Sequence, residues 1–272
     1  MRSIRTSSLF RTVGLLAICG IAPVQAANIL IVAGTNGLAQ TAANVLNADL
    51  GGTNTVTIVN TGVPASLAGF TQIYDVRYNN SPAFTAGEMN QYLAFLNAAP
   101  GNTLFLMGEN TGFNARNTPI NQFIALAGGG TIAAPATTSV ASEVVAAQFR
   151  TPNAITTVTF AACGLVTTSG TGAFASKEAT GGCSLFFGTG ALANAPQGAL
   201  VVVYDVNFIA TAPDGGAVNE IPFRLNLEHF VSAPPPAPVT ATPTLSVWGE
   251  MILALGLCGF AILAGRRRGF ET

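Results

Sequence analysis

The chain has 272 residues, of which 49% are hydrophobic and only 8% charged, and its formal net charge is −1. The part between its two terminal segments, residues 27–238, has five cations and ten acids, a formal charge of −5. Because this balance leaves no basic patch, nucleic acid is excluded as an expected partner.

The N-terminus has the features of a secretory signal peptide. A basic start, residues 1–11, precedes an apolar run at 13–22, and Val24-Gln25-Ala26 fits the positions before a cleavage site. We therefore expect the Sec translocon and signal peptidase as partners, with residues 1–26 removed after Ala26.

The first half of the remaining chain alternates strands with helices. The apolar run at 28–33 is continuous, and such a run indicates a strand buried on both faces, as in a parallel sheet. One helix has a clear start, because Thr85 and Glu88 have the spacing of a capping box. The pattern predicts strands at 28–33, 55–59, 72–78 and 103–107, and helices at 38–50, 85–99 and 119–127.

The second half contains more strands. A helix is predicted at 139–149, followed by strands at 154–162, 172–177, 185–188 and 199–206 and a closing helix at 220–231. The expected fold is one α/β domain over 27–232, a three-layer sandwich with a mostly parallel, flavodoxin-like sheet and a β-rich second half.

Two cysteines remain in this domain once Cys19, in the signal peptide, and Cys258, in the C-terminal tail, are set aside. Cys163 and Cys183 are twenty positions apart, and in an oxidising compartment they predict a disulfide. Two buried thiols or one catalytic thiol are the alternatives. The catalytic thiol lacks support, because His229 is the only histidine and has no evident route to either cysteine.

Polar residues follow several predicted strands. In open α/β sheets ligands bind beyond the carboxyl ends of the strands, so these residues form a candidate binding edge. The candidates are Asn36, Asn79, Glu109, Asn110, Arg116, Asp205 and Asn207. No cofactor or metal is assigned, although Asp75, Glu109 and Asp205 are oxygen ligands of the kind that Ca²⁺ takes.

Each candidate also has a purely structural interpretation. Asp75 and Arg77 share one side of a strand and can pair, and Asn79 can serve to turn the chain. Asn110 can cap the segment that follows it, while Arg116 can hold that loop to Glu109.

The turn Gly108-Glu109-Asn110-Thr111-Gly112 resembles the nucleophile elbow of class I glutamine amidotransferase-like domains, and the likeness covers about the first hundred residues of the domain. It implies a flavodoxin-like fold. Active members have Cys in the middle of this turn, where this chain has Asn110, and their downstream His-x-Glu pair is missing. The resemblance therefore implies the fold without the catalytic triad.

The C-terminal part begins with a Pro-rich linker, residues 233–241, which is expected to be a semi-rigid spacer. Residues 242–272 contain a short motif, an apolar helix and a basic cluster. The apolar run 251–264 is short for a membrane span of about 17–25 residues, and the cluster suits the cytoplasmic side. The residues concerned are Pro243, Thr244, Leu245, Trp248, Gly249, Arg266, Arg267 and Arg268.

This order of motif, helix and arginines resembles the IPTL-CTERM tail, a relative of the PEP-CTERM sorting signals of Gram-negative bacteria. Thr242 stands where that family usually has Ile. The resemblance implies an exosortase-like partner, passage through the inner membrane and transfer to the cell surface. An ordinary C-terminal membrane anchor is the alternative.

Two functions follow from the sequence. The first is an exported, surface-sorted binding or structural protein that is not an enzyme. The second is a secreted hydrolase that acts on glycans or amides through Glu109 and Asp205, with or without a metal. A membrane-anchored assembly factor is a third possibility, and it requires an uncleaved tail.

Overall fold

The computed structural model describes residues 26–138, 140–210 and 218–232. The predicted signal peptide (apart from Ala26), the linker, the sorting motif, the C-terminal apolar helix and the Arg cluster lie outside these ranges. Within them, no helix combines the length and hydropathy needed to cross a membrane.

A nine-stranded sheet in the order β2-β1-β3-β4-β11-β10-β9-β6-β7 forms the centre of the domain. Its first five strands are parallel, and their order, 2-1-3-4 followed by the last strand of the chain, is that of a flavodoxin-like sheet. The predicted fold class is confirmed. The strands are β1 Asn28–Val32, β2 Thr55–Val59, β3 Gln72–Asp75, β4 Thr103–Met107 and β11 Ala199–Val203.

The other four strands extend this sheet in antiparallel fashion and account for the β-rich second half. They are β6 Val140–Val145, β7 Thr157–Ala161, β9 Ala173–Lys177 and β10 Ser184–Phe187. A second, two-stranded sheet pairs β5 Ala136–Thr137 with β8 Gly164–Leu165. We call residues 131–198, the part of the connection between β4 and β11 that contains these strands, the extension.

The helix predicted at 139–149 is wrong. Residues 140–145 form β6, and a 3₁₀ helix, η2 Ala147–Phe149, follows it. Side chains along β6 alternate strictly between exposed and buried, which is the two-residue period of a strand with one buried face. Ala141, Glu143 and Val145 are the buried members.

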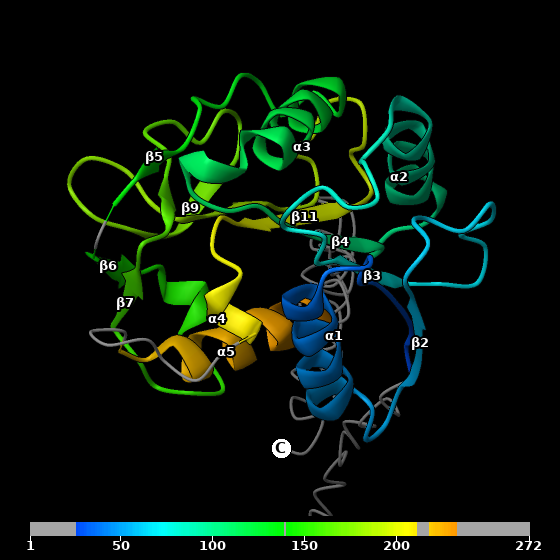
Figure 1. Ribbon diagram of the computed structural model, residues 1–272, viewed down its shortest axis with the longest axis horizontal. Helices are drawn as coiled ribbons and strands as arrows, with labels where there is room; N and C mark the ends of the chain where they lie inside the picture. The colour runs from blue at the N-terminus through cyan, green and yellow to red at the C-terminus, as the bar shows by residue number, and fades with distance from the viewer. Residues whose placement is uncertain (1–25, 139, 211–217, 233–272) are drawn as a thin grey trace, which may run out of the picture.

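Helices cover both faces of the sheet and complete three layers (Figure 1). On one face lie α1 Gly37–Leu50, α4 Asn207–Ala210 and α5 Glu220–Ser232, and on the other α2 Ala86–Ala98 and α3 Asn114–Leu126. Alternate residues of each central strand enter one core or the other: Ile29 and Ile31 pack toward α1, Leu30 and Val32 toward α2.

Two helix starts bear on the predictions. The capping box is confirmed, because Thr85 accepts from the Glu88 N–H while the Glu88 carboxylate accepts from the Thr85 N–H. Helix α3 begins at Asn114 instead of near Pro119, after a short 3₁₀ helix, η1 Thr111–Phe113. Arg116 therefore lies on a helix and not on a loop.

Asp75, the last residue of β3, is completely buried between two arginines. Its carboxylate contacts Arg77 Nη2 at 2.6 Å and Arg116 Nη2 at 2.9 Å, and it accepts from the Tyr92 hydroxyl at 3.0 Å. Burial alone would raise the pKa of Asp75, but the charges of Arg116 and Arg77 hold it well below its usual range. The group is therefore a permanent anion that balances two buried cations.

These contacts connect four elements at one edge of the sheet. Arg77 also pairs with Glu88 on α2 at 3.1 Å, and Arg116 on α3 donates to the carbonyl of Met107 at the end of β4. We call Asp75, Arg77, Glu88, Tyr92 and Arg116 the buried ion network. It fixes β3, β4, α2 and α3 relative to one another.

Replacing Asp75 with Asn should lower the free energy of unfolding by about 3–5 kcal/mol, because two buried guanidinium groups then lose their counter-charge. Asp49→Asn is the matched control. Its ion pair with Arg224 leaves the Asp49 side chain 22% exposed, so we expect a loss of about 1 kcal/mol or less. Chemical denaturation of both variants measures the difference, and equal losses would contradict a structural role for the network.

Candidate binding edge

The carboxyl ends of four parallel strands meet at one edge of the sheet. The segments that leave them are 33–37 after β1, 76–81 after β3, 108–113 after β4 and 204–207 after β11. We call these four segments the strand edge. Six of the seven candidate residues lie on it, and Arg116 is the exception.

Tyr78 and Phe113 place an aromatic pair on the strand edge, with ring centroids 5.2 Å apart. The Tyr78 hydroxyl donates to Asn36 Oδ1 at 3.0 Å, and the same oxygen caps α1 by accepting from the Leu38 N–H. Burial and the nearby charge of Glu109 raise the pKa of Tyr78. Tyr78 is buried, and so is the Oδ1 atom of Asn79, which follows it in the chain. Asn36, Asn79 and Phe113 are half-buried residues, so part of one aromatic ring is accessible near amide groups.

Glu109 connects the ends of β4 and β11. One carboxylate oxygen accepts from the Asn110 N–H and the other from the Val206 N–H, each at 2.8 Å. Burial raises the pKa of Glu109, and these two N–H groups oppose the rise. Both oxygens are therefore engaged in holding two loops together.

Asp205 is buried beside Glu109. Its Oδ1 accepts from the Asn207 N–H at 2.9 Å, while Oδ2 has no hydrogen-bond partner among the described residues. Burial raises the pKa of Asp205 to about 8, with further contributions from the charges of Glu109 and Glu220. Near neutral pH this carboxyl is therefore mostly protonated.

The turn 108–112 after β4, which we call the elbow, has the amide of Asn110 and not a thiol at its middle position. Gly108 is required there, because a Cβ at this position would lie 2.6 Å from the Tyr204 ring. Asn110, at the middle of the turn, caps η1 through Oδ1 and donates through Nδ2 to the carbonyl of Ala162 at 3.2 Å. The structural interpretation of Asn110 as a cap is confirmed.

Part of the extension lies against this elbow. Ala162 has a φ of 61°, in the left-handed region that alanine rarely adopts, and its carbonyl accepts from Asn110. Gly164 follows, with room for no side chain, because a Cβ there would lie 2.6 Å from the Glu109 carbonyl oxygen. Residues 162–164, which we call the covering loop, therefore pack against Glu109 and Asn110 of the elbow.

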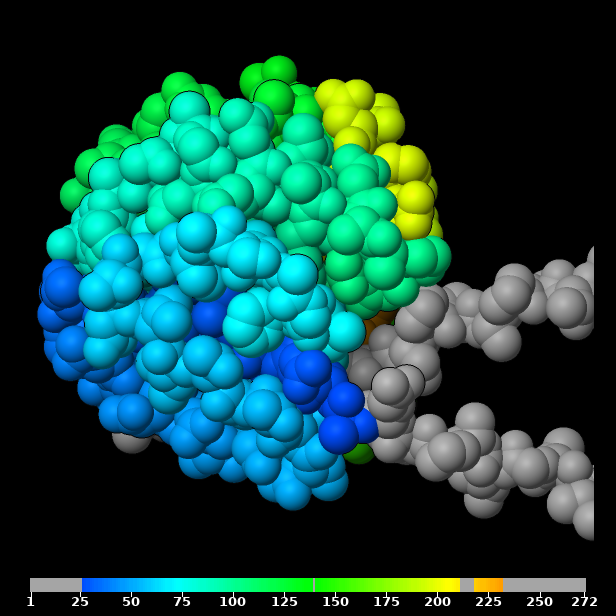
Figure 2. Space-filling view, turned by 90° about the vertical axis from the view of Figure 1, so that its right-hand side faces the viewer, coloured from blue at the N-terminus to red at the C-terminus, as the bar shows by residue number. Residues whose placement is uncertain are grey.

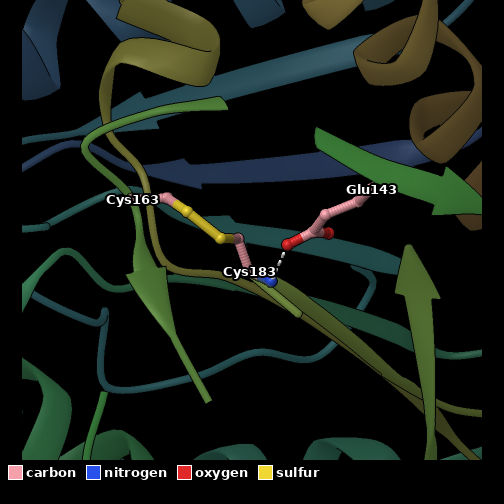
Figure 3. Close-up of side chains that lie close together, drawn as sticks. All are labelled: Glu143, Cys163 and Cys183. Atoms are coloured by element: carbon pink, nitrogen blue, oxygen red, sulfur yellow. Dashed lines mark hydrogen bonds between the residues drawn. A yellow bond between two sulfur atoms is a disulfide. The ribbon is translucent and has the colours of Figure 1, made fainter. Parts of the chain in front are cut away.

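The predicted disulfide between Cys163 and Cys183 is confirmed, and it fixes this covering loop to the start of β10 (Figure 3). Glu143 of β6 points toward the same place. Its carboxylate accepts from the Cys183 N–H at 2.7 Å and from the Ser176 hydroxyl at 2.6 Å. Burial raises the pKa of Glu143 to about 8, against these hydrogen bonds.

Glu143, Cys163 and Cys183 are also close enough to share a metal ion, with potential ligand atoms within 4.8 Å of one another. Metal binding by cysteine requires a thiolate. Because the two sulfur atoms are bonded to each other, the oxidised protein does not offer this set as a metal site.

Arg116 is completely buried in the ion network and is not accessible at the strand edge. It contacts Asp75, a partner 41 positions away, and not Glu109 as the structural interpretation proposed. His229 is exposed on α5. The carbonyl of nearby Val231 accepts from the Thr103 hydroxyl at the start of β4, so His229 lies near the edge opposite the elbow.

The sequence indicates Tyr78 at this edge but does not predict its pairing with Phe113, because the two rings come from different loops. Two hollows also lie away from the strand edge. One, of about 510 Å³, is lined by residues 65–71 and by α2, on the side of the molecule seen in Figure 2. The other, of about 480 Å³, lies in the extension between β6 and β9.

No family model matches the sequence, and no curated protein matches it. The chain is similar to the structure of a ThuA-like protein from Parabacteroides merdae, with a TM-score of 0.49 and 9% identity, over 76% of this chain and 90% of that one. It is also similar to the carbohydrate deacetylase Agd3, with a TM-score of 0.40 and 15% identity, over 66% of this chain and 29% of that one. Neither likeness assigns a family or an activity.

The buried acid Glu143 makes stability depend on pH. Its folded pKa of about 8 exceeds the unfolded value of about 4.3, so the folded protein holds an extra proton between these values and the free energy of unfolding falls as pH rises from about 5 to 8. Glu143→Gln stays uncharged and should reduce this slope. Chemical denaturation at several pH values measures it, and an unchanged slope would contradict the assignment.

Proposed function

We propose that this chain is an exported, surface-sorted binding protein whose α/β domain does not use the nucleophile chemistry of amidotransferase-like enzymes. The observation that carries the proposal is the state of the elbow. Asn110 stands at the nucleophile position, and both ends of its amide are engaged in hydrogen bonds to Gly112 and Ala162. An amide committed in this way supports a structural role for the turn.

The strand edge supports binding of a polar, hydroxyl-bearing ligand such as a saccharide. Ligand sites typically combine apolar or aromatic surface with a few fixed polar groups. Here the half-buried Phe113 ring, packed against Tyr78, supplies the aromatic surface, and the amide NH₂ groups of the half-buried Asn36 and Asn79 supply donors. The Asn36 side chain is held in place by Tyr78 and by the start of α1.

A hydrolase remains the second candidate, and one observation favours it. Burial and the charge of Glu109 raise the pKa of Asp205 to about 8, and a carboxylic acid that keeps its proton near neutral pH can act as a general acid. The burial of both groups favours binding instead, because Glu109 is 4% exposed and Asp205 is 0% exposed.

Binding and hydrolysis can be separated with purified mature protein and a panel of labelled saccharides and amides. Tyr78→Phe and Asn36→Ala should each weaken saccharide binding by about tenfold, the equivalent of one lost hydrogen bond. Asn47→Ala, an exposed position on the same helix α1, is the matched control for Asn36. If the wild-type protein hydrolyses any member of the panel and the Asp205→Asn variant does not, the binding proposal is overturned in favour of the hydrolase.

The sorting part of the proposal rests on the two terminal segments of the sequence. The mature protein isolated from its host should begin at Ala27 and lack the Arg cluster, because an exosortase-like enzyme cuts near the motif. Intact mass of membrane and medium fractions tests this. A product that retains Arg266 to Arg268 would identify a permanent anchor. In either case, reduction of the Cys163–Cys183 disulfide should increase the mass by two hydrogen atoms.

A further inference from the structure

The domain has few cations, and most of them form ion pairs with acidic side chains. Arg77 and Arg116 belong to the buried ion network, and Arg224 pairs with Asp49 and Glu228. Arg150 and Lys177 have no ion pair within the described part of the chain. Both line the same hollow in the extension.

This hollow measures about 480 Å³, within the range of about 300–1,000 Å³ that is usual for small-molecule sites. Its walls come from the end of β6, the residue after η2, and β9 with the turn before it. We call it the cationic hollow. The residues that line it are Val144, Val145, Ala146, Arg150, Ser169, Gly172, Ala173, Phe174 and Lys177.

Arg150 is fixed in the wall of the hollow. Its Nε and Nη2 donate to the carbonyl of Val145, at 2.9 and 2.6 Å. The edge formed by Nη1 and the second N–H of Nη2 has no protein partner among the described residues. A guanidinium presents two parallel N–H groups along such an edge, in the geometry that matches a carboxylate.

Lys177 supplies the second charge from the neighbouring strand. Its backbone pairs with Val144 in the register of β6 and β9, and its side chain is exposed. The nearest acids do not neutralise the pair. Glu143 points to the buried face of β6, and the carboxylate of Glu178 accepts from the Thr180 hydroxyl.

The remaining walls of the hollow indicate which surface the rest of the ligand would contact. Val144, Ala173 and Phe174 are apolar, at least partly exposed and next to the two cations. Such a combination suits a small molecule with one anionic end and a less polar face. The acidic character of the whole domain, with a formal charge of −5 over residues 27–238, disfavours a highly charged polymer such as nucleic acid.

We propose that the cationic hollow binds the carboxylate of an acidic sugar, with Arg150 and Lys177 holding the carboxylate and Phe174 contacting the sugar ring. This site lies in the extension, between β6 and β9, and shares no residue with the strand edge. The saccharide site of the proposed function can therefore fail while this site stands, and the reverse also holds.

Calorimetric titration of the mature protein tests the proposal, with galacturonate, its oligomers and neutral galactose as ligands. Galacturonate should bind and galactose should not, and the affinity should fall as salt increases because the contact is ionic. If the oligomers bind more tightly than galacturonate, the natural ligand is part of a polymer. If both bind with equal affinity, the natural ligand is a free sugar acid.

Lys177→Gln and Arg150→Gln should each weaken galacturonate binding by about tenfold or more, as expected for a charged hydrogen bond. Gln148→Ala, an exposed position near Arg150 that does not line the hollow, is the control and should bind as the wild type does. Arg150→Lys keeps the charge without the planar edge and should bind with intermediate affinity.

Lys177 is exposed, so its variant is expected to fold, and circular dichroism checks this for both charge variants. Two results would overturn the proposal: unchanged galacturonate affinity in folded Lys177→Gln, or equal binding of galactose and galacturonate. Tyr78→Phe should leave galacturonate binding unchanged. A loss in that variant would mean that the anion binds at the strand edge instead.

Discussion

The burial of Asp75 between Arg77 and Arg116 is the constraint on which the sheet edge depends. Removing these charges from water is costly, and only close pairing offsets that cost. The pairing positions the end of β3 against α2 and α3, and Arg116 also holds the last carbonyl of β4. These contacts therefore fix the backbone that leads into the elbow independently of the residues in the elbow itself.

Beyond this anchor, further contacts hold the elbow itself in place. Glu109 joins the ends of β4 and β11, Asn110 joins the elbow to Ala162, and the Cys163–Cys183 bond holds the covering loop. An active elbow needs a nucleophile within reach of a base and an open position for the substrate. Here the middle position of the elbow is Asn110, whose amide is engaged by Gly112 and Ala162.

The local sequence pattern predicts those strands and helices whose burial follows one regular period along their whole length. Strands buried on both faces read as continuous apolar runs, and the Thr85–Glu88 box marked the start of α2. The region 140–145 was predicted as a helix because a short Ala/Val-rich run fits both periods, and only its pairing with β7 and β9 decides. The partner of Arg116 was missed for a related reason: Asp75 lies 41 positions away, and no local spacing signals such a contact.

The extension also carries the two cations of the domain that have no ion pair among the described residues. In a chain with so few cations, pairing elsewhere leaves Arg150 and Lys177 as the uncompensated pair within the described residues, and the fold places both in one hollow. An anion bound in this hollow would supply a counter-charge that the described residues do not give either cation. The extension that packs against the elbow thus also forms the cationic hollow, and we propose that anion binding there is what this segment adds to the fold.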